Sequence, residues 1–93
     1  MPAQYPYLRP EILPPSPPPR LTPSYCKIAH TQPLKEQFLS QHIRLFIYVW
    51  TTAHNSFWMY PMECSNGFLA GYAWQKHGWQ YVRLGINQID SYV

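Results

Sequence analysis

The sequence predicts a mainly β protein: a small five-stranded antiparallel barrel, preceded by one short helix and a proline-rich extended arm. Residues 74–93 place two tryptophans around a polar turn and continue into an alternating apolar run interrupted by Gly85, a pattern typical of a closing hairpin and a last strand. Nine of the eleven prolines fall in residues 1–23, so the remainder must supply the core. Aromatic residues make up 17% of the chain, which lets a small domain bury enough area without disulfides.

The length of 93 residues fits one domain, which we place at residues 31–93 behind an arm of residues 1–30. The net charge is +3, but residues 43–93 carry three basic and two acidic side chains, which weakens any account based on phosphate contacts. Two cysteines are too few for a disulfide framework and indicate reduced thiols, with an arm-to-domain bridge as the alternative. The N-terminus lacks the apolar run of a signal peptide, and residues 45–50 are too few to span a bilayer, so we expect a soluble cytoplasmic protein without a membrane partner.

The arm is too rich in proline to form a helix or an interior strand. Residues 14–19 are expected to populate polyproline II. Within the arm, Pro15, Pro18 and Arg20 match the P-x-x-P-x-basic pattern that aromatic grooves such as those of SH3 domains bind, which predicts a protein partner. The alternative, which composition alone favours, is a solvated linker.

Residues 31–42 are predicted to form the helix. Thr31 fits an N-cap and Pro33 is tolerated in the first turn. An apolar stripe along one face would lie against the sheet, made of Leu34, Phe38 and Gln41 with Leu39 adjacent.

Five strands are expected at residues 43–52, 57–62, 68–75, 79–84 and 89–93. The first alternates but is largely apolar on both faces, so one face should line the interior while the helix or the arm covers the other.

The connections between these strands carry turn signals. Residues 53–56 make the first turn, and Asn66-Gly67 predicts a type I′ hairpin because both positions need positive φ angles. Gly71, inside a strand, indicates a bulge or a sharp bend. Asn87-Gln88 is expected to form a single turn before the last strand.

The spacing of several short motifs resembles the WYL domain, an SH3- or Sm-like β-barrel of prokaryotic transcriptional regulators and some defence-system proteins. The resemblance covers about residues 34–93 and lies at Phe46-Ile47-Tyr48, Met59-Tyr60-Pro61, Asn66-Gly67, Ala70-Gly71-Tyr72 and residues 82–89. It implies the barrel fold and a nucleic-acid or nucleotide-like ligand.

The chain departs from the WYL pattern where that family is thought to hold its ligand. The name-giving triplet is absent near residues 69–71, Val82 and Gln88 stand in place of arginines, and Asn87 replaces an aspartate. The resemblance therefore transfers the fold and little of the ligand chemistry.

The candidate binding site is a set of aromatic and basic residues on the predicted sheet. Small barrels bind single-stranded nucleic acid by stacking bases on rings beside a basic groove. Trp79, Tyr81 and Arg83 occupy alternate positions of one predicted strand, so their side chains should lie on one face of the sheet. The full candidate set is Trp79, Arg83, Tyr81, Trp74, Lys76 and Arg44, within a wider group of rings that includes Tyr48, Trp50, Trp58 and Tyr60. The alternative is that most of these rings are core and that two or three are exposed.

No catalytic or metal-binding pattern is present in the sequence. The four carboxylates are scattered, the four glycines form no phosphate-binding loop, and Cys26 with His30 is the one closely spaced ligand pair. A dyad of Cys64 with a loop histidine would need a lowered thiol pKa, whereas Glu63 should raise it. We therefore expect a non-enzymatic binding or regulatory module without cofactor or metal. The competing hypothesis is a protein-interaction or structural subunit that forms homo-oligomers or engages a partner through its arm.

Overall fold

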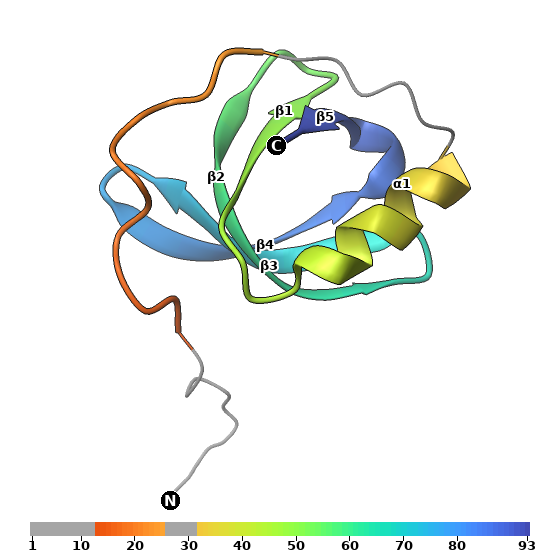
Figure 1. Cartoon of the computed structure of the whole chain (residues 1–93), viewed down its shortest axis with the longest axis horizontal. Helices are drawn as coiled ribbons and strands as arrows, with labels where there is room; N and C mark the ends of the chain where they lie inside the picture. The colour runs from red at the N-terminus through yellow and green to blue at the C-terminus, as the bar shows by residue number, and fades with distance from the viewer. Residues whose placement is uncertain (1–12, 26–31) are drawn as a thin grey trace, which may run out of the picture.

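The computed structural model describes residues 13–25 and 32–93 and contains one antiparallel sheet with one short helix packed on it (Figure 1). The strand order is β4-β3-β2-β1-β5, so the last strand returns to pair with the first. The elements are α1 (Gln32–Leu39), η1 (Ser40–His42), β1 (Ile47–Thr51), β2 (Ser56–Ser65), β3 (Phe68–Gln75), β4 (Gly78–Gly85), η2 (Ile86–Gln88) and β5 (Ile89–Tyr92).

The predicted class is confirmed, but closure of the sheet into a barrel is not. The described strands leave β4 and β5 as the two edges of an open sheet. The physical reason lies in the link between them: the 3₁₀ turn η2 carries the chain away from β4, and the short β5 pairs with β1 instead. Beside the edge strand β4, the residues that line a surface pocket include Phe57 of β2 and Val82 and Leu84 of β4.

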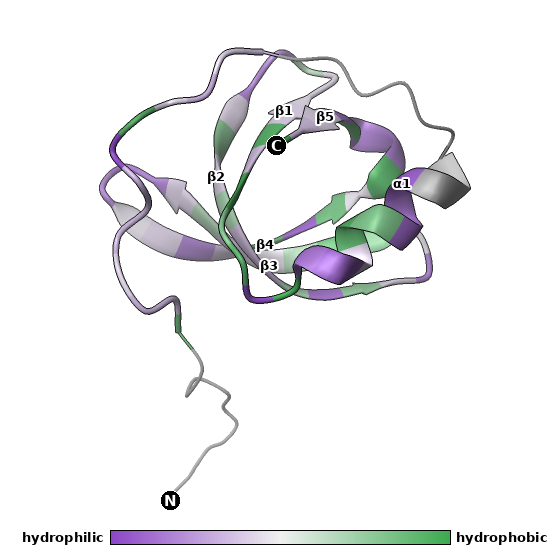
Figure 2. Cartoon of the chain, in the orientation of Figure 1, coloured by the Kyte–Doolittle hydropathy of each residue, from purple (hydrophilic) through white to green (hydrophobic). Residues whose placement is uncertain are grey.

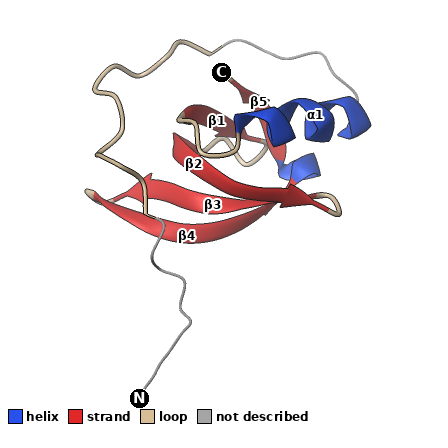
Figure 3. Cartoon of the chain, turned by 60° about the horizontal axis from the view of Figure 1, so that its bottom comes forward, coloured by secondary structure: helices blue, strands red, loops and turns tan. Residues whose placement is uncertain are grey.

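One face of the sheet packs on α1 around an aliphatic core (Figure 3). Leu39 of α1 is fully buried and belongs to the core cluster of the sheet. Phe38 packs partly against this cluster, whereas Gln41, expected on the same stripe, is exposed. The hydropathy colouring shows apolar residues on α1 and on the strands around it (Figure 2). The fully buried aliphatic members are Leu39, Ile47, Val49, Met59, Leu69, Ile86 and Ile89.

The first strand begins later than predicted. Residues 43–46 form a turn in which the amide of Leu45 donates to the carbonyl of His42 at 3.0 Å. Arg44 has a φ of +64°, which ends the regular extended run. The amide of Arg44 donates to the carbonyl of Pro61 at 2.7 Å, so this turn is fastened to β2.

The irregularity predicted at Gly71 is present, but the extra residue lies on the facing strand. The β2–β3 register shifts between Pro61 and Glu63. A Cβ at position 71 would overlap the carbonyl oxygen of Tyr60 and lie 2.7 Å from the Cα of Pro61. Gly71 is therefore required because the bulged backbone of β2 passes too close for any side chain.

Both tight hairpins have the mirror-image backbone that matches strand twist. Asn66 and Gly67 have φ angles of +52° and +81°, as the Asn-Gly signal predicts. Lys76 and His77 have φ angles of +53° and +67°, although neither is a glycine, the residue that adopts this region without strain. Within the described residues, no helix is long and apolar enough to cross a membrane.

Candidate functional site

The face of the sheet opposite α1 is built almost entirely of rings. Strand alternation places two aromatic side chains from each of four strands on this side, while Val49, Met59 and Ala73, which lie between the rings on the first three strands, point to the core. We call this surface the aromatic face; it comprises Tyr48 and Trp50 on β1, Trp58 and Tyr60 on β2, Tyr72 and Trp74 on β3, and Trp79 and Tyr81 on β4.

Cross-strand pairing brings these rings into edge-to-face contact. The centroids of Tyr48 and Trp58 lie 5.2 Å apart on neighbouring strands. The pairs Tyr72–Tyr81 and Trp74–Trp79 have centroid distances of 5.1 Å and 5.0 Å, respectively. Such tilted pairs suit the quadrupoles of the rings and hold each indole in a defined orientation.

The arm lies against this aromatic face. The indole Nε1 of Trp79 donates a hydrogen bond to the carbonyl oxygen of Ser16 at 3.2 Å. The next residues of the arm, including Pro18 and Arg20, share an open groove of the surface with Trp58 and Trp74. Figure 1 shows the arm running around the side of the sheet from the β3–β4 hairpin toward the β1–β2 end.

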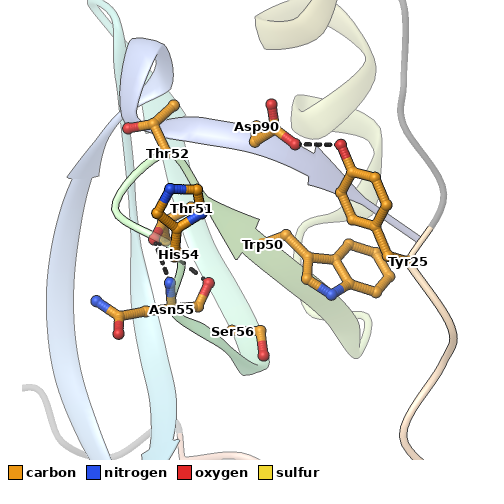
Figure 4. A pocket seen from close by; sticks show the side chains of 8 residues that line it. All are labelled: Tyr25, Trp50, Thr51, Thr52, His54, Asn55, Ser56 and Asp90. Carbon is orange, nitrogen blue, oxygen red and sulfur yellow. Dashed lines mark hydrogen bonds between the residues drawn. The ribbon is translucent and has the colours of Figure 1, made fainter.

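A second contact fixes the far end of the described arm (Figure 4). The Tyr25 hydroxyl donates to Oδ2 of Asp90 on β5 at 2.5 Å. The Tyr25 ring meets Trp50 edge-on, with centroids 5.4 Å apart and planes at 85°. Beside this contact lies a cavity of about 570 Å³, whose described walls are Tyr25, Trp50, Thr51, Thr52, His54, Asn55, Ser56 and Asp90.

The β1–β2 turn forms the polar wall of that cavity. The hydroxyl of Thr51 accepts from the amide of Asn55 at 3.1 Å, and the Tyr48 hydroxyl and Ser56 hydroxyl lie 3.0 Å apart. His54 takes a φ of +67° at the tip. These bonds give the wall a fixed shape, with the Trp50 indole as its apolar side.

The sequence-predicted site residues do not all come together. Trp74, Trp79 and Tyr81 lie on the aromatic face, as their parity predicts. Arg83 shares that side of β4 but lies at its far end, with its guanidinium carbon 4.1 Å from the centroid of Phe68. Lys76 is exposed in the β3–β4 turn and Arg44 is exposed before β1, so the basic residues form no single groove with the rings.

The rings are neither plain core nor freely exposed. Tyr48 and Tyr60 are 8% exposed, although they lie on the side away from α1. The four tryptophans are half-buried, and Tyr81 is 51% exposed. The sheet is therefore apolar on both faces, with aliphatic residues toward α1 and aromatic residues toward the arm.

The sequence left open whether the helix or the arm covers the outer face of the first strand, and the structure places the arm against the aromatic side. Pro18 and Arg20 of the predicted motif line the groove, while Pro15 is exposed just before Ser16. The roles of Ser16, Tyr25 and Asp90 carry no local sequence signal. The regular placement of two rings per strand was a usable signal for the face itself.

The thiol of Cys64 is free and half-buried. Burial raises its pKa, and the carboxylate of Glu36 on α1 raises it further. The expected direction is therefore confirmed, but the acidic neighbour is Glu36 and not Glu63. Cys26 and His30 lie outside the described residues; within the described part, no three metal-ligating side chains gather.

Comparison of the chain with family models, with curated proteins and with solved structures finds no match.

Proposed function

We propose that this protein is a non-enzymatic interaction module whose aromatic face binds proline-rich segments of protein partners. The observation that supports this most directly is the hydrogen bond from the Trp79 indole to the Ser16 carbonyl, next to prolines that line one groove with Trp58 and Trp74. The chain thus carries an example of the ligand on its own surface.

The chemistry of the face suits such a ligand. Proline rings are flat and apolar and pack on indole faces, and a proline-rich chain loses little conformational entropy when it binds. Its carbonyl groups point outward and need donors, which Trp79 supplies through Nε1. Each half-buried tryptophan contributes large contact area at a low entropic cost.

The arm competes with any partner because it is tethered to the same chain. Attachment to the same chain raises the local concentration of the arm at this face, and a short connection gives effective concentrations in the millimolar range. A partner must therefore bind the aromatic face strongly enough to displace the arm. For the same reason, the unmodified protein should bind isolated peptides weakly.

A peptide titration tests the proposal. The probe is a synthetic peptide with the sequence of residues 13–25, and the readout is tryptophan fluorescence or amide chemical shifts. The hosts are the natural full-length chain and an arm-weakened full-length chain carrying Pro17→Gly, Pro18→Gly and Tyr25→Ala. Binding should be tighter to the arm-weakened chain by at least roughly tenfold. A scrambled peptide of the same composition is the control, and absence of peptide binding by both proteins would contradict the proposal.

A second candidate ligand is single-stranded nucleic acid or a nucleotide-like effector, which the WYL resemblance implies. The specific observation in its favour is the end of β4, where Tyr81 is 51% exposed and lines a surface pocket with Phe68 and Arg83. Oligonucleotide affinity that falls steeply with salt and is lost in Arg83→Ala would support it. Salt-insensitive peptide binding that survives Arg83→Ala would favour the proline-rich ligand.

A further inference from the structure

The arm is held at two fixed points that lie nine residues apart in the chain. The first is the Ser16 carbonyl, bound by Trp79 on β4. The second is the Tyr25 hydroxyl, bound by Asp90 on β5. Because β4 and β5 are opposite edges of the sheet, the arm spans the distance between them across the aromatic face.

The second point has the features of a site for a neutral phenol. Asp90 offers a carboxylate oxygen that accepts the hydroxyl proton, and a hydrogen bond to a charged group is stronger than one between neutral groups. Trp50 receives the edge of the ring. Among the described residues around the adjacent cavity, Asp90 is the one carboxylate, and a phosphate in place of the hydroxyl would face this group.

We propose that the aromatic face selects proline-rich segments that carry an unphosphorylated tyrosine about nine residues after the carbonyl bound by Trp79. This inference rests on the proposed function and names its ligand class. Phenylalanine would keep the ring contact with Trp50 and lose the hydrogen bond to Asp90. Phosphotyrosine would place about 1.5 to 2 negative charges against the carboxylate and remove the donor.

The geometry also explains why spacing matters. An extended chain covers at most about 3.3–3.6 Å per residue, so each residue removed between the two anchors shortens the reach of the ligand by that amount. Moving the tyrosine four positions toward the prolines should therefore weaken binding, because the shorter segment must straighten or release one anchor. Adding residues should cost less, because an excess can form a loop.

The test measures the affinities of four peptides for one protein, the arm-weakened full-length chain. They are the native sequence of residues 13–25, its Tyr25→Phe form, its form phosphorylated at Tyr25, and a form with four residues deleted between the prolines and the tyrosine. We expect affinity to fall roughly tenfold for the phenylalanine peptide, since a hydrogen bond to a charged group is worth about 1.5 kcal/mol or more. The phosphorylated and shortened peptides should bind more weakly still.

A reciprocal variant, Asp90→Asn, separates charge from shape. In this host the native peptide should bind more weakly, and the penalty for phosphorylation should shrink because the repelling carboxylate is gone. Equal binding of the native and phenylalanine peptides would overturn the tyrosine inference and leave the proposed function standing. Tighter binding of the phosphorylated peptide would overturn it as well. Failure of every peptide to bind would overturn both.

Discussion

The Trp79 indole donates its hydrogen bond to the carbonyl of Ser16, a residue 63 positions earlier in the chain. This bond joins the edge strand β4 to the proline-rich arm. The Trp79 ring is at the same time held by Trp74, 5.0 Å away on the facing strand. The donor is therefore presented in a fixed direction, and the arm meets a surface whose orientation is set in advance.

Trp79→Phe should release the arm without unfolding the sheet. The change keeps a ring against Trp74 and removes the indole N–H, which is worth about 0.5–1.5 kcal/mol. Trypsin cleavage after Arg20, which lies in the docked segment, should accelerate roughly two- to tenfold. Cleavage after the exposed Lys76 reports on the sheet and should keep its rate.

Tyr72→Phe is the matched control for this experiment, because it removes one polar atom from the same face, on the facing strand β3. Its cleavage rate after Arg20 should equal that of the natural protein. If Trp79→Phe leaves the rate after Arg20 unchanged, the hydrogen bond does not hold the arm in solution.

Gly71→Ala should destabilise the protein strongly. The added methyl group meets the backbone of Tyr60 and Pro61, which cannot move aside as a flexible side chain would. Overpacking of this kind costs about 1–3 kcal/mol and sometimes more. The measurement is the midpoint of urea unfolding. Gly78→Ala is the control, since nothing lies within 4 Å of its Cβ position, and it should change stability by less than about 1 kcal/mol. Equal effects of the two substitutions would contradict the close approach at the bulge.

Replacing Lys76-His77 by Asn-Gly should stabilise the protein. Both residues have positive φ angles, which cost non-glycine residues roughly 1–2 kcal/mol each, whereas Asn-Gly is the preferred type I′ pair. The gain in the free energy of unfolding should be about 1 kcal/mol, a rise in Tm of about 4–8 °C. An Ala-Ala replacement at the same positions should give no gain, and a lower Tm for the Asn-Gly variant would refute the assignment of the turn.

The hairpins of this fold and the positions of most strands along the chain were largely readable from the sequence because their signals are local. Asn66-Gly67 predicts its own turn, and β3 begins and ends where alternation predicts. The prediction of a closed barrel was wrong because closure depends on whether β4 and β5 pair with each other. The alternation of residues within each strand is the same in a closed barrel and in an open sheet. The bulge was placed at Gly71 because glycine marks it, yet the extra residue belongs to the partner strand.

The site was harder to predict because its contacts are long-range. The alternate positions of Trp79 and Tyr81 correctly predicted that the two side chains lie on the same face of the sheet. No sequence pattern specifies what covers that face. Tyr25 and Asp90 lie 65 positions apart and are each unremarkable in their local context. The acidic neighbour of Cys64 was predicted wrongly for a similar reason. Glu63 is next to Cys64 in sequence, but strand alternation turns adjacent side chains to opposite faces. The helix brings Glu36 to the thiol instead.

The stability of the protein should fall with alkaline pH through Cys64. Burial and the carboxylate of Glu36 raise the pKa of the folded thiol above 9.0, its ordinary value, so the folded state holds this proton more tightly than the unfolded chain. The resulting contribution is fully present below pH 9 and is lost as the pH rises through the folded pKa. Tyr92, whose pKa is raised by burial and then by the Cys64 thiolate, should extend the decline above pH 10.

Urea midpoints at pH 7 and pH 10 measure this decline for the natural protein and for Cys64→Ser, which removes the titrating thiol and should flatten the profile. Glu36→Gln is the intermediate case. It can keep the hydrogen bond from the Gly67 amide, 3.3 Å long in the natural protein, and loses the charge, so its decline should be shallower than that of the natural chain. The alkaline decline in stability should be steepest for the natural protein, intermediate for Glu36→Gln and flattest for Cys64→Ser. This order follows if burial and a nearby carboxylate together raise the pKa of the thiol. A profile for Cys64→Ser as steep as that of the natural protein would place the alkaline loss elsewhere in the fold.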